Sequence, residues 1–196
     1  MKQIALVAAL ILCAPAARAA EKLSLSELSA YLNALTTAEA SFTQINDDGT
    51  LSTGKLYIHR PGRMRFEYDG ENGATVVAGA GSVVIHDPKS NQPPETYPLK
   101  RTPLSIILAK TVDLGQADMV VGHQFDGTTT ILQAQDPENP EYGGLELMFT
   151  DDPVELRKWV VHDSAGGRTT VVLGALETGG KLSSFLFTTG AGSGSR

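Results

Sequence analysis

Apolar residues near the start of the chain recur at intervals of three and four, which is the period of one face of a helix. At the start of this stretch, Ser24 and Glu27 have the spacing of a capping box, in which each side chain satisfies a backbone N–H group of the first turn. These features predict an amphipathic helix of about three turns. Its apolar positions are Leu25, Leu28, Leu32 and Leu35.

After this helix the period changes to two, and short alternating runs are separated by residues that favour turns, such as those at 46–49 and 61–62. The alternation predicts about eleven antiparallel strands. They comprise the runs around Phe42 and Gln44, around Leu56 and Ile58, and over residues 64–68, 75–78, 82–86, 119–125, 128–135, 145–149, 156–162, 169–175 and 184–187.

Many short strands joined by tight turns indicate one strongly curved sheet or open barrel, so the predicted fold is mainly β with short helices (α+β). One helical pattern follows the polar loop 91–94: Thr102 suits an N-cap, Pro103 suits a first helical position, and apolar residues follow to Leu108. The two helices either complete a packed core or form a movable cover over an apolar cavity. The pattern alone leaves both interpretations open.

The two ends of the chain differ from the rest. Residues 1–19 carry Lys2, an apolar stretch and small residues before the predicted cut, which is the anatomy of a cleavable signal peptide. We therefore expect a single domain over residues 20–189, followed by a disordered Gly/Ser-rich tail at 190–196. Cleavage removes Cys13, so the mature chain would form no disulfide. This suits the bacterial periplasm, with full secretion as the alternative.

Composition narrows the class of protein further. The 196 residues are 41% hydrophobic and 19% charged, which supplies a real core and excludes disorder along the whole chain. Without the two basic residues of the signal peptide, 14 basic side chains stand against 22 acidic ones, a net charge of −8. This acidic balance argues against a nucleic-acid partner.

Patterns for catalysis or metal binding do not assemble in this sequence. The 4 histidines fall at predicted strand ends without helical pairing, so a zinc site is not expected. Ser52 and Lys55 match the Ser-x-x-Lys spacing of penicillin-interacting enzymes, but they lie in an alternating strand and not at a helix start. We therefore expect a protein that is not an enzyme and has no cofactor or metal.

The order of several short motifs resembles one family, the periplasmic outer-membrane lipoprotein carrier proteins, LolA. The resemblance rests on Ala-Ser-Phe-Thr-Gln at 40–44, Gly-Lys-Leu-Tyr-Ile at 54–58, His-Arg-Pro-Gly-Arg-Met-Arg-Phe at 59–66 and Thr-Pro-Leu at 102–104. Residues 163–170 resemble the family's late hairpin, and residues 185–187 its closing strand. The resemblance implies a half-open β-barrel covered by a helical lid.

The resemblance also implies a function, which is to carry lipoproteins through the periplasm with their acyl chains shielded in an apolar cavity. The cargo would come from an ATP-driven lipoprotein-releasing complex in the inner membrane. It would pass to an outer-membrane acceptor resembling LolB, or to the outer membrane directly. We expect a monomer. The alternative hypothesis is a periplasmic binding or sensor module for lipoproteins or another amphiphile on the same scaffold.

By position, Arg60 matches the family arginine that hydrogen-bonds the lid and holds it shut. Without the resemblance, Arg60 would be interpreted as a solvated charge before Pro61. Arginine suits a latch because its planar fork donates several hydrogen bonds and stays charged. The residues expected to contact acyl chains, for which ordinary core packing is the alternative, are Phe42, Leu56, Ile58, Met64, Phe66, Tyr68, Leu104, Ile107, Leu108 and Trp159.

Overall fold

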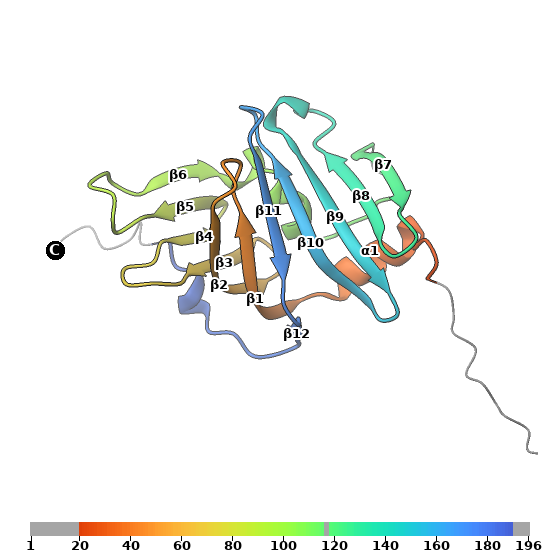
Figure 1. Ribbon diagram of the computed structural model, residues 1–196, viewed down its shortest axis with the longest axis horizontal. Helices are drawn as coiled ribbons and strands as arrows, with labels where there is room; N and C mark the ends of the chain where they lie inside the picture. Colours follow the sequence, from red (N-terminus) through yellow and green to blue (C-terminus); the bar gives the residue numbers. More distant parts are fainter. Residues whose placement is uncertain (1–19, 116–117, 190–196) are drawn as a thin grey trace, which may run out of the picture.

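The computed structural model describes residues 20–115 and 118–189, and the predicted signal peptide 1–19 and predicted tail 190–196 lie outside them. The described chain forms one antiparallel sheet of 12 strands, curved around two short α-helices (Figure 1). The sheet does not close, because its order begins at β6 and ends at β7. The predicted mainly β fold, a half-open barrel with a helical cover, is confirmed.

Helix α1 (Leu25–Ala34) begins where the capping box predicts. The Ser24 Oγ accepts a hydrogen bond from the Glu27 N–H at 3.2 Å, and the Glu27 carboxylate accepts one from the Ser24 N–H at 2.8 Å. The side chain and backbone of Ser24 together lower the pKa of Glu27 below its ordinary value. Leu28 and Leu32, one turn apart, are fully buried and attach the helix to the core.

The strands follow the predicted alternation closely, with inner-face residues buried and outer-face residues more exposed. Each strand pairs antiparallel with its neighbours. Their bounds are β1 (Thr37–Ile45), β2 (Leu51–His59), β3 (Arg63–Tyr68), β4 (Thr75–Gly79), β5 (Ser82–His86), β6 (Glu95–Pro98), β7 (Val120–Phe125), β8 (Thr130–Gln135), β9 (Gly144–Asp151), β10 (Val154–His162), β11 (Arg168–Leu173) and β12 (Glu177–Thr178).

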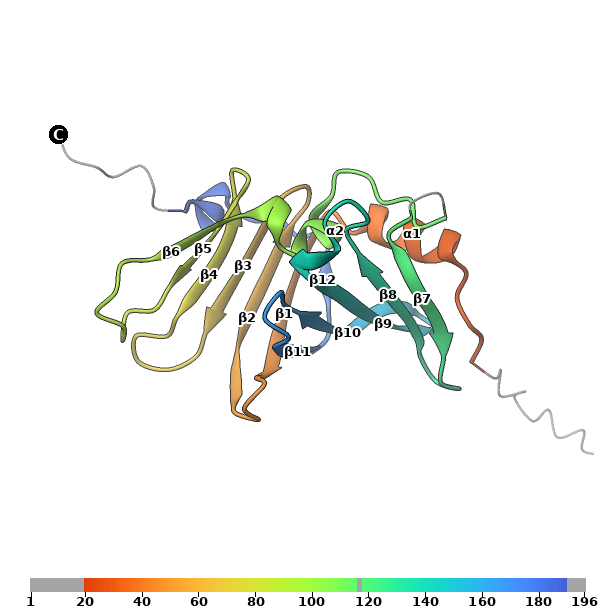
Figure 2. The ribbon, with the colours of Figure 1, turned by 90° about the horizontal axis from the view of Figure 1, so that it is seen from above.

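The sheet is strongly curved, and one contact measures this directly. The spatial order is β6-β5-β4-β3-β2-β1-β11-β10-β9-β8-β7, with β12 paired to β1. Four strand spacings separate β3 from β10, which is about 19 Å on a flat sheet. The ring centroids of Phe66 on β3 and Trp159 on β10 nevertheless lie 6.2 Å apart. The sheet therefore curls until inner-face side chains of distant strands meet. Figure 2 shows the curvature of the strands.

Helix α2 (Leu104–Leu108) lies on the concave side of the sheet, where its Ile106, Ile107 and Leu108 are buried. A 3-10 turn, η1 (Leu99–Arg101), leads into it. The predicted helix is present but begins one residue later than expected: Pro103, with φ −58° and ψ −20°, is the N-cap. The prediction of Thr102 as the N-cap is wrong, because its hydroxyl donates to the Leu99 carbonyl at 2.8 Å. A second 3-10 turn, η2 (Pro140–Tyr142), precedes β9. Helix α2 is thus an apolar plug inside the curve of the sheet.

The prediction of a closing strand at residues 184–187 is wrong. These residues form a 3-10 turn, η3 (Ser184–Phe187), in which Phe187 is buried and Phe185 is 82% exposed. The Ser183 Oγ accepts a hydrogen bond from the Phe185 N–H and so starts the turn. Phe185 and Phe187 alternate as they would in a strand. The preceding strand β12 pairs with β1, however, and both sides of β1 are already occupied, by β2 on one side and by β11 and β12 on the other.

The strands β6 and β12 are absent from the sequence prediction. All their residues are exposed, so neither strand has the apolar period that identifies a half-buried strand. Pro94 precedes β6 and Pro98 ends it. Prolines and polar side chains are typical of an edge strand, which must not recruit another chain.

Candidate functional site

The concave face collects the residues that the sequence predicts for acyl-chain contact. Alternation along β1, β2, β3 and β10 turns one side chain in two toward the inside, and α2 adds its apolar face from above. All of the predicted residues belong to one hydrophobic cluster or pack against it. These are Phe42, Leu56, Ile58, Met64, Phe66, Tyr68, Leu104, Ile107, Leu108 and Trp159.

Aromatic rings form the floor of this cluster. Phe42 lies 5.2 Å from Phe66 and 5.2 Å from Tyr68, both at an interplanar angle of 87°. Trp159 completes the group edge-on to Phe66. Edge-to-face pairs of this kind add about 0.5–1.5 kcal/mol each beyond the burial of their area. The rings of the floor therefore stabilise one another.

An open cavity of about 340 Å³ adjoins the floor, between the ends of several strands and the start of α2. Four of the predicted residues line it, namely Phe66, Tyr68, Leu104 and Trp159. Valines from β4, β10 and β11 complete the apolar wall, and polar side chains form the rim. The sequence prediction missed these lining residues, which include Val76, Val161, Val171, Gln44, Arg101 and Asp163.

Arg60, the predicted latch, follows β2 and is 8% exposed. Its guanidinium donates a hydrogen bond of 2.7 Å from Nη2 to the carbonyl of Ala109, the residue that ends α2. Burial lowers the pKa of Arg60 below its ordinary value, but a guanidinium remains charged at neutral pH. The Nε of Arg60 is buried without a hydrogen-bond partner among the described residues.

A second attachment joins the segment after α2 to helix α1. The Asn33 side chain donates to the Val112 carbonyl at 2.7 Å and accepts from the Val112 N–H at 2.9 Å, as a neighbouring strand would. Ser29 Oγ accepts from the Leu114 N–H at 3.0 Å. The sequence prediction missed Asn33, because a polar residue on an amphipathic helix is normally solvated. Helix α2 is thus held between Arg60 on one side and α1 on the other.

The comparison with known proteins decides the family. A family model described as outer membrane lipoprotein carrier protein LolA matches residues 33–190, which is more than half of the chain. The chain belongs to the LolA family. Members of this family are carrier proteins, and the membership supports a role in carrying or binding lipoproteins.

Individual relatives of this LolA-family chain are distant. The outer-membrane lipoprotein carrier protein of Chromohalobacter salexigens is 26% identical over 172 residues, covering 82% of this chain and 80% of that protein. The protein of the same description from Coxiella burnetii is 24% identical over 171 residues, covering 83% and 80%. The solved structure of a LolA superfamily protein from Nitrosomonas europaea has a TM-score of 0.43 at 7% identity, covering 85% of this chain and 98% of that chain.

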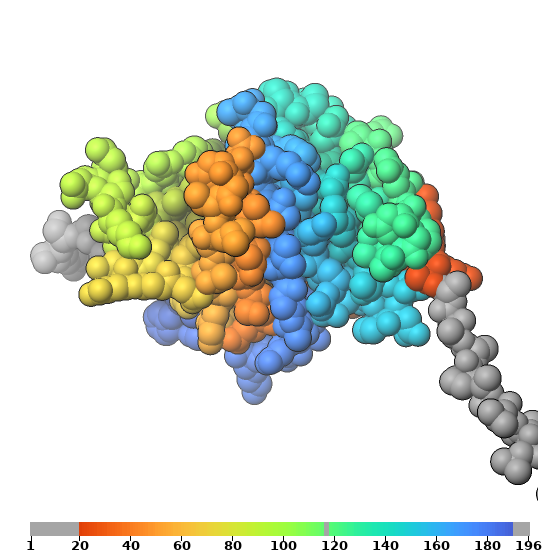
Figure 3. Space-filling view, viewed as in Figure 1, coloured from red at the N-terminus to blue at the C-terminus, as the bar shows by residue number. Residues whose placement is uncertain are grey.

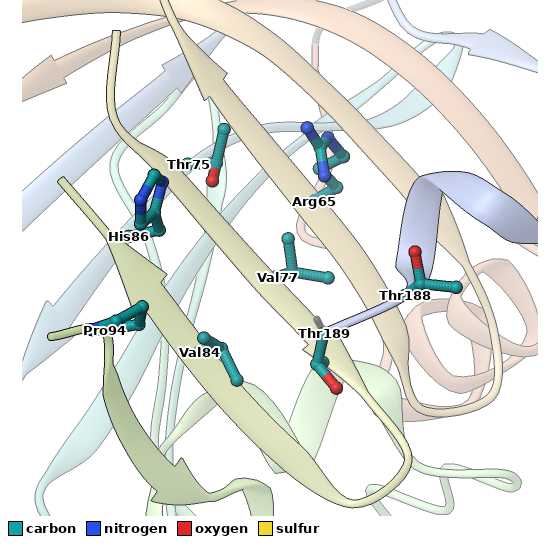
Figure 4. A pocket seen from close by; sticks show the side chains of 8 residues that line it. All are labelled: Arg65, Thr75, Val77, Val84, His86, Pro94, Thr188 and Thr189. Atoms are coloured by element: carbon teal, nitrogen blue, oxygen red, sulfur yellow. The ribbon is translucent and has the colours of Figure 1, made fainter. Parts of the chain in front are cut away.

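The LolA-family chain has a second groove, of about 230 Å³, on the convex face of the same strands (Figure 4). Its floor is formed by Val77 and Val84, and Arg65 and His86 lie on one side. Thr189, from the segment after η3, lies on the other. Figure 3 shows the convex face, on which β1 (orange) and β11 (blue) lie side by side. The groove lies on the face opposite to α2, so we exclude it from the candidate site.

Other kinds of site find no support in the part of the chain that the structure describes. In residues 20–115 and 118–189, no three His, Cys, Asp or Glu side chains gather where they could hold a metal ion. No described helix has the length and apolar character needed to span a bilayer. The concave cluster with its cavity and the attached α2 therefore remains the candidate functional site of this LolA-family chain.

Proposed function

We propose that this protein shields the acyl chains of lipoproteins inside its curved sheet and ferries them across the periplasm. In this proposal the cargo comes from an ATP-driven releasing complex in the inner membrane and passes to an acceptor at the outer membrane. The observation that carries the proposal is α2, an apolar plug held in the concave face by the hydrogen bond from Arg60 to Ala109. Family membership supports the class of cargo.

The free space inside the sheet is too small for the whole cargo. The cavity of about 340 Å³ is at the lower end of the range of about 300–1,000 Å³ that is usual for a single small ligand. Several fatty chains therefore require more room than the closed form offers. In this proposal, moving α2 opens the apolar cluster to which Ile58, Met64 and the aromatic floor belong together with Ile107 and Leu108.

The energetics of such cargo require a cover of this kind. Each buried CH₂ group contributes about 0.8 kcal/mol, so three ordinary acyl chains amount to roughly 30 kcal/mol. Non-covalent affinity saturates at about 18–21 kcal/mol, and complexes near that limit dissociate far too slowly for transport. A plug that fills the empty cavity lowers the net affinity, because the cargo must displace it. Cargo can then be passed on.

Arg60 is the latch in this proposal. Its bond to Ala109 fixes the end of α2, and the N–H of Gly62 donates to the carbonyl of Leu108 at 2.9 Å beside it. Two neighbouring attachments thus fix the last turn of the plug to the β2–β3 turn. The pair Asn33 and Val112 holds the segment that follows, so we assign the pivot of the movement to this segment.

The test is a release assay with purified components. The mature protein is mixed with inner-membrane vesicles that contain the ATP-driven releasing complex and a labelled lipoprotein. We expect a soluble one-to-one complex of protein and lipoprotein that forms only with ATP. A protein that recovers no lipoprotein from active vesicles would refute the carrier function.

A second stage of the assay distinguishes a carrier from a binding or sensor module. The isolated complex is incubated with outer-membrane vesicles, and the lipoprotein that sediments with them is measured. A carrier passes its cargo on and is recovered empty. A module that retains the lipoprotein with functional outer-membrane vesicles present would exclude the ferrying step and leave only binding.

A further inference from the structure

Two of the polar side chains that line the cavity, Tyr68 and Gln44, are hydrogen-bonded to each other. Tyr68 is the last residue of β3, Gln44 lies near the end of β1, and both line the cavity near its rim. The Tyr68 hydroxyl donates to the Gln44 Oε1 at 2.7 Å. Burial raises the pKa of Tyr68 above its ordinary value, so the hydroxyl keeps its hydrogen at neutral pH.

The direction of this hydrogen bond is fixed from outside the cavity. Asp48, in the turn between β1 and β2, accepts from the Thr50 hydroxyl at 2.6 Å, and a carboxylate at neutral pH can only accept. Thr50 in turn accepts from the Asn46 Nδ2 at 2.8 Å, and the Asn46 Oδ1 accepts from the Gln44 Nε2 at 2.6 Å. This orientation leaves Gln44 Oε1 to accept from Tyr68.

The chain of bonds leaves the Tyr68 oxygen as an acceptor. The hydrogen of the Tyr68 hydroxyl is committed to Gln44, and among the described residues no donor reaches its oxygen. The Tyr68 oxygen is therefore free to accept a hydrogen bond from a ligand. Of the two linkages that attach acyl chains, amide and ester, only the amide carries an N–H that can donate to this oxygen.

We infer that the Tyr68 oxygen, held as an acceptor by the hydrogen bond to Gln44, recognises the amide group at the head of an acyl chain by accepting a hydrogen bond from the amide N–H. This inference rests on the proposed carrier function and adds a specificity to it. The aromatic floor and α2 would hold the chains, while the polar pair at the rim selects cargo whose acyl group is linked through an amide. Esters supply no hydrogen for the Tyr68 oxygen and are bound less well.

The test compares three proteins, the natural protein and two variants, with two ligands. One ligand is a synthetic lipopeptide whose terminal cysteine is acylated through an amide and two esters, and the other is the same lipopeptide with that amide N-methylated. Affinity is measured by displacement of a fluorescent fatty-acid probe. Tyr68→Phe keeps the ring that contacts Phe42 and Phe66, and removes only the hydroxyl. Tyr57→Phe, on the convex side of β2, is the matched control.

We expect the natural protein and Tyr57→Phe to bind the N–H lipopeptide about fivefold more tightly than the N-methyl one, the factor typical of one hydrogen bond. Tyr68→Phe should bind both ligands alike. Equal affinity of the natural protein for both ligands, or a preference that survives in Tyr68→Phe, would overturn the inference while leaving the carrier function standing. Binding of neither lipopeptide by the natural protein would instead overturn the carrier function and this inference with it.

Discussion

Helix α2 and the 3-10 turn η3 are two short helical segments that cover opposite faces of the same sheet. Each is tied down by an arginine that donates to a backbone carbonyl, Arg60 to Ala109 inside and Arg65 to Leu186 outside. Arg65 is also ion-paired with Glu67 at 2.6 Å. Arg60 has no such carboxylate among the described residues, and its Nε is buried without a partner.

In the proposed function, this difference distinguishes a fixed cover from a latch that can open. A buried polar group without a partner costs about 1–3 kcal/mol, which opening of α2 would relieve by letting water reach the Arg60 Nε. Opening η3 would let water reach the Nδ1 of His59, which is also buried without a partner among the described residues and whose ring lies 5.7 Å from that of Phe187. It would relieve nothing at Arg65, which already has its counter-charge in Glu67. The two segments therefore differ in their arginines, and in the proposed function the inner segment is the one that moves.

The largest expected effect comes from shortening the plug itself. Ile107 is fully buried, so Ile107→Ala removes apolar contacts that exist only while α2 is closed. We expect the closed form to lose at least about 2 kcal/mol and the affinity for a fluorescent fatty-acid probe to rise about thirtyfold.

The matched change on the outer face is Phe187→Ala. It should lower the melting temperature while probe affinity stays within about twofold, since η3 does not cover the cavity. A rise in probe affinity with Phe187→Ala as large as with Ile107→Ala would show that the two segments do not differ in function.

The next effect in size concerns the two arginines. Arg60→Leu removes a charge-assisted bond and leaves the Ala109 carbonyl unpaired in the closed form, while it also removes the unpartnered Nε. The lost bond and the unpaired carbonyl destabilise the closed form by more than the removal of the unpartnered Nε stabilises it. We therefore expect the affinity for the fatty-acid probe to rise about tenfold. Cargo should then be accepted readily and handed to outer-membrane vesicles slowly.

Arg65→Leu serves as the control for this pair, because it removes an equivalent bond on the convex face. It should leave probe affinity and cargo transfer unchanged and should lower the melting temperature. Transfer at the natural rate by Arg60→Leu would remove Arg60 from the mechanism.

Helix α1 and the regular strands can be predicted from the sequence, because their apolar residues recur at the same positions that the fold buries. The capping box sets the start of α1, and the inner face of β3 is visible in the alternation of Met64, Phe66 and Tyr68. Residues 184–187 mislead for the same reason, since a 3-10 turn can bury one aromatic and expose another as a strand would.

The candidate site is harder to predict from the sequence than the fold is. The alternation of apolar and polar residues identifies the apolar residues of the inner face. It does not distinguish residues that line the cavity, such as Phe66, from residues that are fully buried in the core, such as Leu56. The partner of Arg60 is a backbone carbonyl, and the partner of Asn33 lies 79 positions away. Neither partner can be recognised from its residue type, because both hydrogen bonds are made with the backbone. The two attachments therefore could not be predicted from the sequence.

The smallest effect, and the sharpest comparison, uses two adjacent valines of β4. Val76 lines the inner cavity and Val77 the outer groove. Val76→Ala should weaken binding of the fatty-acid probe about threefold, because a bound chain loses the contact of two methyl groups. Val77→Ala makes the same chemical change one residue away and should leave binding unaltered. Equal losses would mean that the probe does not distinguish the two faces, and the inner cavity would no longer be the favoured site. A loss confined to Val76 would assign the acyl chains to the face that α2 covers.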